Sequence, residues 1–240
     1  MVERQEILDR VRHALASEAA IGARASSIRL ALDGGTLTMT GEVADISVKK
    51  LALEAAAGTA GVEGILDRLH VRPAAPMGDR EIARHVCDAF LQESAFGECA
   101  IGILGNGERE MARAPVAPRG HLEIAVADGV VTLNGALPGL VRKRLAGVLA
   151  WWVPGSRDVI NGIAVEPEET DSDHAIVEAV RIVLEKDPFV DASQIRIAAR
   201  HGVARLTGLV PTDSERDMAG FDAWYVFGVD KVLNEIQVHA

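Results

Sequence analysis

Cysteine is nearly absent from this 240-residue sequence, which contains only Cys87 and Cys99. These two residues match no zinc-ligand spacing and cannot build a disulfide framework. The seven histidines are scattered, and no two form the i, i+4 helical pair or the i, i+2 strand pair that a zinc site uses. We therefore predict no metal site, and we interpret both cysteines as semi-buried thiols.

Long apolar runs are also missing, and no segment reaches the roughly 18 apolar residues of a membrane-spanning helix. The first ten residues are charged and lack the apolar core of a signal peptide. If Met1 is the true start, the expected location is the cytoplasm. If the sequence begins downstream of the natural N-terminus, a periplasmic location stays open.

Positive charge is scarce, because the formal net charge is −10 and it is unevenly distributed. Residues 167–240 hold 7 bases and 14 acids, whereas the two preceding thirds are close to neutral. Binding to nucleic-acid phosphates requires a basic surface, so we expect no nucleic-acid partner.

Catalytic motifs are absent as well. No serine or cysteine occupies a nucleophile elbow, and no glycine cluster precedes a helix as in a phosphate-binding loop. Carboxylates are abundant, but the sequence isolates no pair for acid–base chemistry. We therefore predict that the protein is not an enzyme and that it holds no cofactor.

What the sequence contains is one pattern written three times. In each copy two glycines lie 6 residues apart, a third follows 20 residues later, and a valine closes the copy after 10 more. The glycines and valines of the three copies are Gly35, Gly41, Gly61 and Val71; Gly129, Gly135, Gly155 and Val165; Gly202, Gly208, Gly228 and Val238. Such self-similarity predicts three structural units of one type.

Each copy has the hydrophobic periodicity of a helix, two strands, a second helix and a last strand. The clearest case is the alternation of residues 36–43, which follows the turn residues Asp33, Gly34 and Gly35 and predicts a half-buried hairpin strand. We predict an α+β fold with domains at 1–72, 79–166 and 173–240. Residues 102–120 resemble neither of the other copies and are rich in glycine and proline, so we expect an inserted loop there.

The copies end in a shared motif, seen at residues 159–165 and 232–238, with Asn161 and Asn234 at its third position. The first copy ends in residues 65–71, with Asp67 at that position. The three units resemble the BON domain of bacterial osmotic-stress and envelope proteins. The resemblance implies αββαβ units with two helices on one face of a three-stranded mixed sheet. It also implies a non-enzymatic module associated with osmotic stress, phospholipid surfaces and, in some members, potassium.

Three glycines, Gly41, Gly135 and Gly208, lie at inward positions where a strand ends. We expect a structural role for them, because a side chain there would strike the packed helix or because the backbone needs an unusual φ.

Bases and aromatic residues mark the second helix of the copies. Lys49, Lys143 and Arg216 occupy one shared position, and Arg142 and Arg144 flank Lys143. These bases fit either a solvated helix face or a contact with anionic lipid. The pair Trp151–Trp152 matches the pair Trp224–Tyr225, and it fits either packing between units or an anchor at a membrane interface.

Three functions remain open from the sequence. One is an envelope module that binds phospholipid or envelope proteins, with Arg142, Lys143, Arg144, Trp151 and Trp152 as its surface. The second is a soluble cytoplasmic protein that senses potassium at a site that the sequence does not locate. The third is a protein scaffold that acts through the insertion at 102–120. The sequence specifies no oligomeric state.

Overall fold

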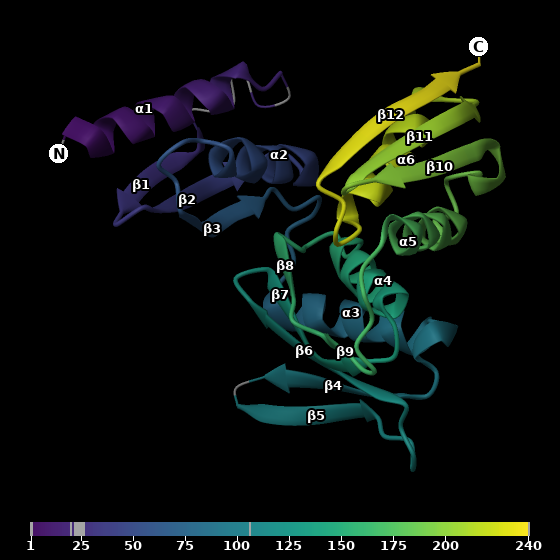
Figure 1. The fold of residues 1–240 in the computed structure, drawn as a ribbon. Coiled ribbons are helices and arrows are strands. Elements are labelled where there is room, and N and C mark those ends of the chain that lie inside the picture. Colours follow the sequence, from purple (N-terminus) through teal and green to yellow (C-terminus); the bar gives the residue numbers. More distant parts are fainter. Residues whose placement is uncertain (1, 20, 22–26, 106, 240) are drawn as a thin grey trace. The chain divides into compact units, whose positions relative to one another are not determined.

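The structure is a computed structural model that describes residues 2–19, 21, 27–105 and 107–239 (Figure 1). It divides into two compact units, residues 1–72 and residues 73–240. The first unit holds the first repeat, and the second unit holds the middle and third repeats.

The first repeat has the predicted order of elements. They are α1 (Val2–Ser17), β1 (Arg29–Asp33), β2 (Thr36–Val43), α2 (Ile46–Ala57) and β3 (Gly64–Val71). Strand β2 pairs antiparallel with β1 and parallel with β3, and this makes a three-stranded mixed sheet. Alternate residues of β2 are buried, as the sequence predicted, because one face of the sheet packs against the helices and the other is solvated.

The middle repeat contains more strands than predicted. Its elements are α3 (Asp79–Gln92), η2 (Ser94–Phe96), β4 (Cys99–Gly105), β5 (Glu108–Arg113), β6 (Gly120–Ala127), β7 (Val130–Leu137), α4 (Leu140–Trp151), β8 (Asp158–Asn161) and β9 (Ala164–Val165). They form a six-stranded sheet in the order β5-β4-β6-β7-β8, with β9 also paired to β7. Figure 1 shows β4 and β5 at the outer edge of this sheet.

The expectation of a loop at residues 102–120 is therefore wrong. Strand β4 pairs parallel with β6 and antiparallel with β5, so the insertion extends the sheet as a hairpin. The glycines Gly105 and Gly107 lie at the turn between the two strands, and the prolines follow β5. Glycine and proline content therefore marked the ends of these strands, whereas their pairing with β6 is a non-local contact that composition does not report.

The third repeat returns to five main elements around a short 3₁₀ turn. They are α5 (Asp173–Lys186), η3 (Ala192–Gln194), β10 (Ile195–Arg200), β11 (Val203–Val210), α6 (Asp213–Tyr225) and β12 (Lys231–Val238). Strand β11 pairs antiparallel with β10 and parallel with β12, as β2 does with its neighbours. One continuous apolar core runs through the middle and third repeats, which explains why they form a single compact unit.

In each repeat the third residue of the closing motif, which lies on the last strand, bonds to the second helix. Asn161 and Asn234 each donate from Nδ2 to the carbonyl of the helix residue 18 positions earlier, at 2.8 and 2.7 Å. Each amide lies directly against a helix glycine, Gly147 or Gly220, where a Cβ would be 2.9 or 2.7 Å from Nδ2. The glycine provides the space, and the asparagine satisfies the backbone of the helix.

The first repeat uses a different arrangement at the same place. Leu53 replaces the helix glycine, and the motif residue is Asp67. Here Lys49 reaches from the helix, with its Nζ 2.7 Å from the Leu69 carbonyl oxygen and 3.0 Å from a carboxylate oxygen of Asp67. Lys49 is only 4% exposed, so the solvated helix face is wrong for this residue. The replacement of glycine and asparagine is compensated by an ion pair between the buried Lys49 and the exposed Asp67.

The three matched glycines have the structural role that the sequence predicted, with one correction. Their φ values are +144° at Gly41, +129° at Gly135 and +154° at Gly208, a region that residues with side chains rarely adopt. A Cβ at these positions would collide with a backbone carbonyl oxygen at the beginning of the preceding strand or just before it, not with a helix. The contacted oxygens belong to Ser27, His121 and Gln194.

We expect the Gly135→Ala variant to lower the free energy of unfolding by about 3 kcal/mol, because it combines backbone strain with a clash against backbone. Urea unfolding followed by circular dichroism measures the change. Gly105→Ala is the matched control, since nothing lies within 4 Å of its Cβ position. That control should change stability by about 0.5 kcal/mol or less. Equal stability losses in the two variants would contradict the assignment.

Candidate functional site: the basic and aromatic face of helix α4

Helix α4 carries four of the five residues that the sequence proposed as a lipid or partner surface, and the fifth, Trp152, is its C-cap. It begins after Gly139, and its first turn is capped by the linker between the repeats, because the Leu140 amide donates to Glu169 Oε2 at 2.9 Å. The helix packs against α3 on one side and against α5 and α6 of the third repeat on the other. Within residues 73–240, much of the surface of α4 is therefore covered by other helices.

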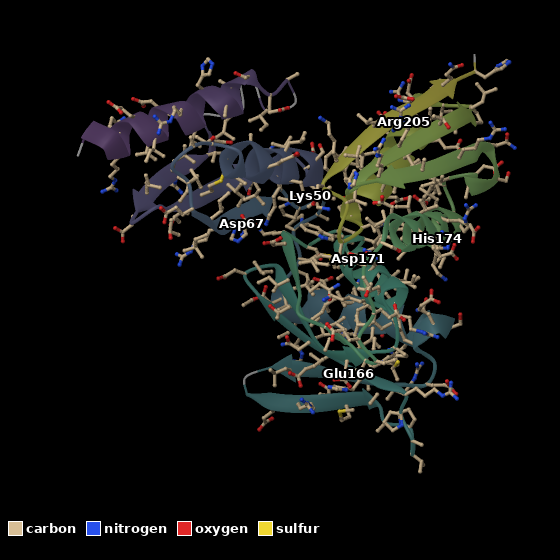
Figure 2. All side chains as sticks on the ribbon, in the orientation of Figure 1. Lys50, Asp67, Glu166, Asp171, His174 and Arg205 are labelled. Carbon is tan, nitrogen blue, oxygen red and sulfur yellow. The ribbon has the colours of Figure 1, made fainter. Side chains whose placement is uncertain are left out.

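Arg144 is completely buried, so it does not lie on an open surface. Its Nη2 donates to both carboxylate oxygens of Asp171 at 2.7 Å, and its Nε donates to the carbonyl of Phe227 at 2.7 Å. Figure 2 shows Asp171 on the segment that leads into α5. Arg144 thus joins the middle repeat, the linker and the third repeat, and its predicted place on a lipid surface is wrong.

The two neighbouring bases also engage protein groups. The Nζ of Lys143 lies 5.2 Å from the centre of the Phe227 ring, within the range of a cation–π contact. Arg142 is exposed, and it donates to the carbonyls of Ala95 at 3.1 Å and Pro138 at 2.9 Å. The run of three bases therefore points in three directions, as successive residues of a helix must.

Both tryptophans contact the third repeat. The Trp151 ring stacks on Tyr225 with the ring centres 5.6 Å apart and an angle of 22° between the planes. The Trp152 Nε1 donates to Asp222 Oδ1 at 2.9 Å. Each tryptophan is half-buried. The sequence left two interpretations of the tryptophans open. These contacts agree with the first, packing between two repeats of the chain.

Asp222 is the most perturbed ionisable group of this contact. It is 3% exposed, and its Oδ2 has no hydrogen-bond partner among the described residues. Burial raises its pKa to about 8, the nearby Asp187 carboxylate adds to the increase, and the bond from Trp152 only partly opposes it. Asp222 is therefore mostly protonated at neutral pH. Sequence reasoning missed it, since no local pattern distinguishes this aspartate from the others on α6.

The remaining predicted residues lie apart from this site. Arg216, at the position of Lys143 in the third repeat, forms ion pairs with Asp213 and Asp217. Cys87 and Cys99 are buried free thiols, and burial raises the pKa of both. They are more deeply buried than the semi-buried thiols that we expected.

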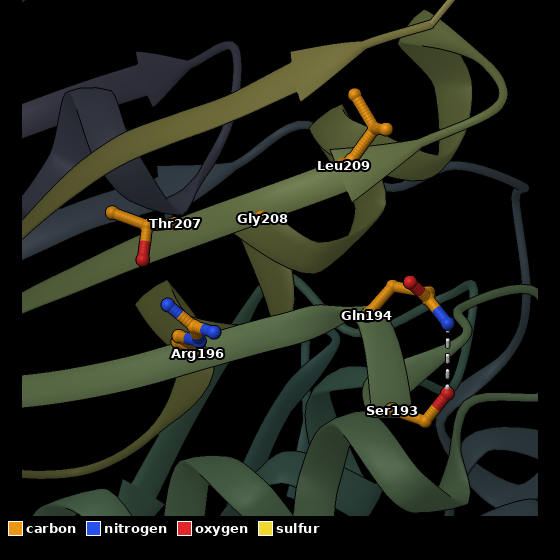
Figure 3. Close-up of a pocket in the computed structure, with 6 residues that line it drawn as sticks. All are labelled: Ser193, Gln194, Arg196, Thr207, Gly208 and Leu209. Carbon is orange, nitrogen blue, oxygen red and sulfur yellow. Dashed lines mark hydrogen bonds between the residues drawn. The ribbon is translucent and has the colours of Figure 1, made fainter.

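A separate hollow of about 360 Å³ lies on the sheet of the third repeat (Figure 3). Figure 3 shows Arg196 from β10 and Thr207 from β11 on the open side of the two strands, and they are partners in the strand register. The complete lining is Ser193, Gln194, Arg196, Thr207, Gly208 and Leu209. The sequence did not predict this hollow, although outward alternation along β10 places Arg196 on that face.

Metal sites and membrane-spanning helices are the two other features to consider. Among the described residues no group of three or more histidine, cysteine, aspartate or glutamate side chains is arranged to hold a metal ion. Within the same residues, none of the helices has both the length and the apolar character needed to cross a membrane.

Comparison with known families decides the affiliation. The model of the BON domain matches three segments, residues 4–73, 108–167 and 172–240. The chain belongs to the BON domain family. The second match begins at β5, so α3 and β4 lie outside it. The prediction of tandem BON domains in an α+β fold is confirmed.

No curated protein matches the chain. Two solved structures of the Type III secretion protein CdsD of Chlamydia trachomatis are similar. One, its C-terminal domain, is 12% identical with a TM-score of 0.26, and the alignment covers 98% of both chains. The other is 13% identical with a TM-score of 0.25, and covers 98% of this chain and 92% of the other.

We expect Arg144→Ala to lower the free energy of unfolding of residues 73–240 by about 3 kcal/mol, because it removes a buried guanidinium and leaves its acceptors unpaired. Urea unfolding of the full chain, followed by tryptophan fluorescence, measures the change. The neighbouring exposed residue offers a control, since Arg142→Ala should cost about 0.5 kcal/mol or less. Similar losses for the two arginines would show that burial at Arg144 is not decisive.

Asp222 should make the protein less stable as pH rises. Below pH about 4 the carboxyl is protonated in both folded and unfolded chains. Between there and the folded pKa of about 8, the unfolded chain has released the proton and the folded chain keeps it. The free energy of unfolding should therefore fall by about 1.4 kcal/mol per pH unit from this group alone.

The Asp222→Asn variant should lose this contribution, because the amide preserves an acceptor for Trp152 and cannot ionise. Urea unfolding from about pH 5 to about pH 8 gives the slope of the free energy of unfolding against pH for the variant and for the parent chain. Asp187→Asn is the companion variant, and it should move the same transition to lower pH. Parallel pH profiles for the parent and Asp222→Asn would contradict the shifted pKa.

Proposed function

We propose that this protein is a non-enzymatic binding protein whose partners are other proteins, in the envelope-associated and stress-related setting that BON domains imply. BON domains are non-catalytic binding domains, and the chain holds three of them. The observation that carries the proposal is the set of contacts made by helix α4. Its bases and tryptophans, the residues best suited to lipid, contact protein instead.

The exposed aromatic residues of the third repeat support this function. The chain has five phenylalanines, and Phe90 and Phe96 are fully buried in the middle repeat. The other three belong to the third repeat, where Phe189 is 71% exposed, Phe227 50% and Phe221 38%. Aromatic side chains are enriched in protein interfaces, so their concentration on one repeat favours a protein partner.

Lipid binding through α4 receives less support. Of its three adjacent bases only Arg142 is exposed, and an exposed base near an anionic surface contributes about 1 kcal/mol. Stable attachment generally needs two signals, and the tryptophans that would supply the second are engaged with Tyr225 and Asp222. Potassium sensing has no located site to support it.

The test combines photo-crosslinking with vesicle binding. A photoreactive phenylalanine analogue at Phe189 should crosslink to a protein in cells, and that protein, once purified, should bind the purified full chain. Phosphatidylglycerol vesicles at about 0.15 M salt should not sediment the chain. A thermal-shift series should give equal melting temperatures in potassium and sodium chloride.

The outcomes separate the three functions. Sedimentation with the vesicles that is lost in the Arg142→Glu, Lys143→Glu double variant would establish the lipid function in place of this one. That double variant keeps the buried Arg144, so the fold is preserved. A melting temperature raised by potassium alone would favour the ion sensor.

A further inference from the structure

The middle repeat shows what the open edge of this fold can bind. Strands β6 and β10 occupy the same place, each being the first strand of its hairpin and antiparallel to the central strand. In the middle repeat β4 pairs with β6 in parallel, from the pair Cys99 and Gly120 to the pair Leu104 and Ala125. In the third repeat β10 is the edge strand of the described sheet.

The edge of β10 presents backbone groups to an incoming strand. Arg200 and Val203 flank the tight turn of the hairpin, so they form its first hydrogen-bonded pair. Because the pattern alternates, Ile197 and Ala199 direct their N–H and C=O groups away from β11. The N–H of Ile195 is already bonded to the Ala192 carbonyl. An edge strand of this kind is a template for adding another strand.

The helix beside each edge differs according to whether the edge is covered. Cys87 is the ninth residue of α3, and it is buried next to the sheet that β4 extends. Its counterpart, the ninth residue of α5, is Arg181, which is exposed. The third repeat thus places a charged side chain on the helix where the middle repeat has an apolar one under its extra strand.

The charged residues on β10 indicate what kind of strand could pair with it. In the middle repeat Arg109 of the inserted hairpin forms an ion pair with Glu123 of β6. Arg109 reaches across Gly102, the β4 residue paired with Glu123, since its Cγ lies 3.5 Å from a Cβ position there. Arg196 takes the place of Glu123 in the third repeat, and Arg200 is exposed on the same face of β10. The sign of the edge is reversed, so it complements carboxylates.

We propose that β10 binds an extended, carboxylate-bearing segment of a partner protein, which adds to the third sheet as a parallel strand in the way that β4 adds to β6. The hollow lined by Arg196 and Thr207 then receives one carboxylate side chain of that segment (Figure 3). This inference rests on the proposed protein-binding function and names its surface and the chemistry of its partner.

Two synthetic peptides test the proposal on the full chain: a heptapeptide of alternating valine and glutamate, and its counterpart with lysine in place of glutamate. The acidic peptide should bind and protect the amides of Ile197 and Ala199 from hydrogen exchange. A nitroxide at its C-terminus should broaden the amide signal of Arg200, which reports parallel pairing. Arg196→Glu should weaken the acidic peptide by about tenfold and improve the basic one.

Two further variants make the test specific. Arg205→Glu has the same charge change on the same face but on the central strand β11, so it should keep its preference for the acidic peptide. Ala199→Pro removes an outward N–H from the edge and should abolish binding of both peptides, with circular dichroism to verify its fold.

Equal effects of Arg196→Glu and Arg205→Glu would overturn the proposal, as would broadening confined to the other end of β10. Protection of amides at another surface would overturn it as well, while leaving a protein-binding function in place. If neither peptide binds, the proposal is overturned as well, and the crosslinking from Phe189 then decides the proposed function separately.

Discussion

The guanidinium of Arg144 is the interaction on which the arrangement of residues 73–240 depends. It is a fully buried charge, and it holds Asp171 of the linker and the carbonyl of Phe227 at the same time. A buried charge without partners is strongly unfavourable, so the linker and the third repeat must keep these two acceptors in place. The stacking of Trp151 on Tyr225 and the bond from Trp152 to Asp222 then have fixed geometry. Two small domains consequently share one core.

The acidic linker has a structural use in this arrangement. Glu169 caps the first turn of α4, and Asp171 neutralises Arg144, so two of the acids that make the last third of the chain so negative are part of the contact. Both placements follow from electrostatics, because an acid is favourable at the N-terminus of a helix and beside a buried base. The net charge of a segment therefore says little about the charge of its solvent-exposed surface. The third repeat illustrates this, with exposed arginines on β10 in an acidic domain.

The three repeats show how far one fold can vary at fixed positions. The contact between the last strand and the second helix is an asparagine against a glycine in two repeats and an ion pair between a buried lysine and an exposed aspartate in the other. The edge of the sheet is covered by an inserted hairpin in the middle repeat, whereas β10 is an edge strand in the third. The strained glycine near the end of the second hairpin strand is kept in all three, because two backbones approach each other there and no side chain fits. Positions limited by backbone contact are thus retained, while those limited by side-chain chemistry change together.

The sequence by itself determined the number of repeats, the order of their elements, the alternation of β2 and the special role of Gly41, Gly135 and Gly208. These features follow from residue spacing and local periodicity, which are properties of the linear sequence. The tertiary structure alone decided that Arg144 is buried while Arg142 is exposed, that β4 and β5 pair as a hairpin, and that Asp222 retains a proton. Adjacent residues of a helix face different neighbours, strand pairing joins distant segments, and a pKa depends on what surrounds the group in space. Each of these is a non-local contact, and no pattern along the chain contains it.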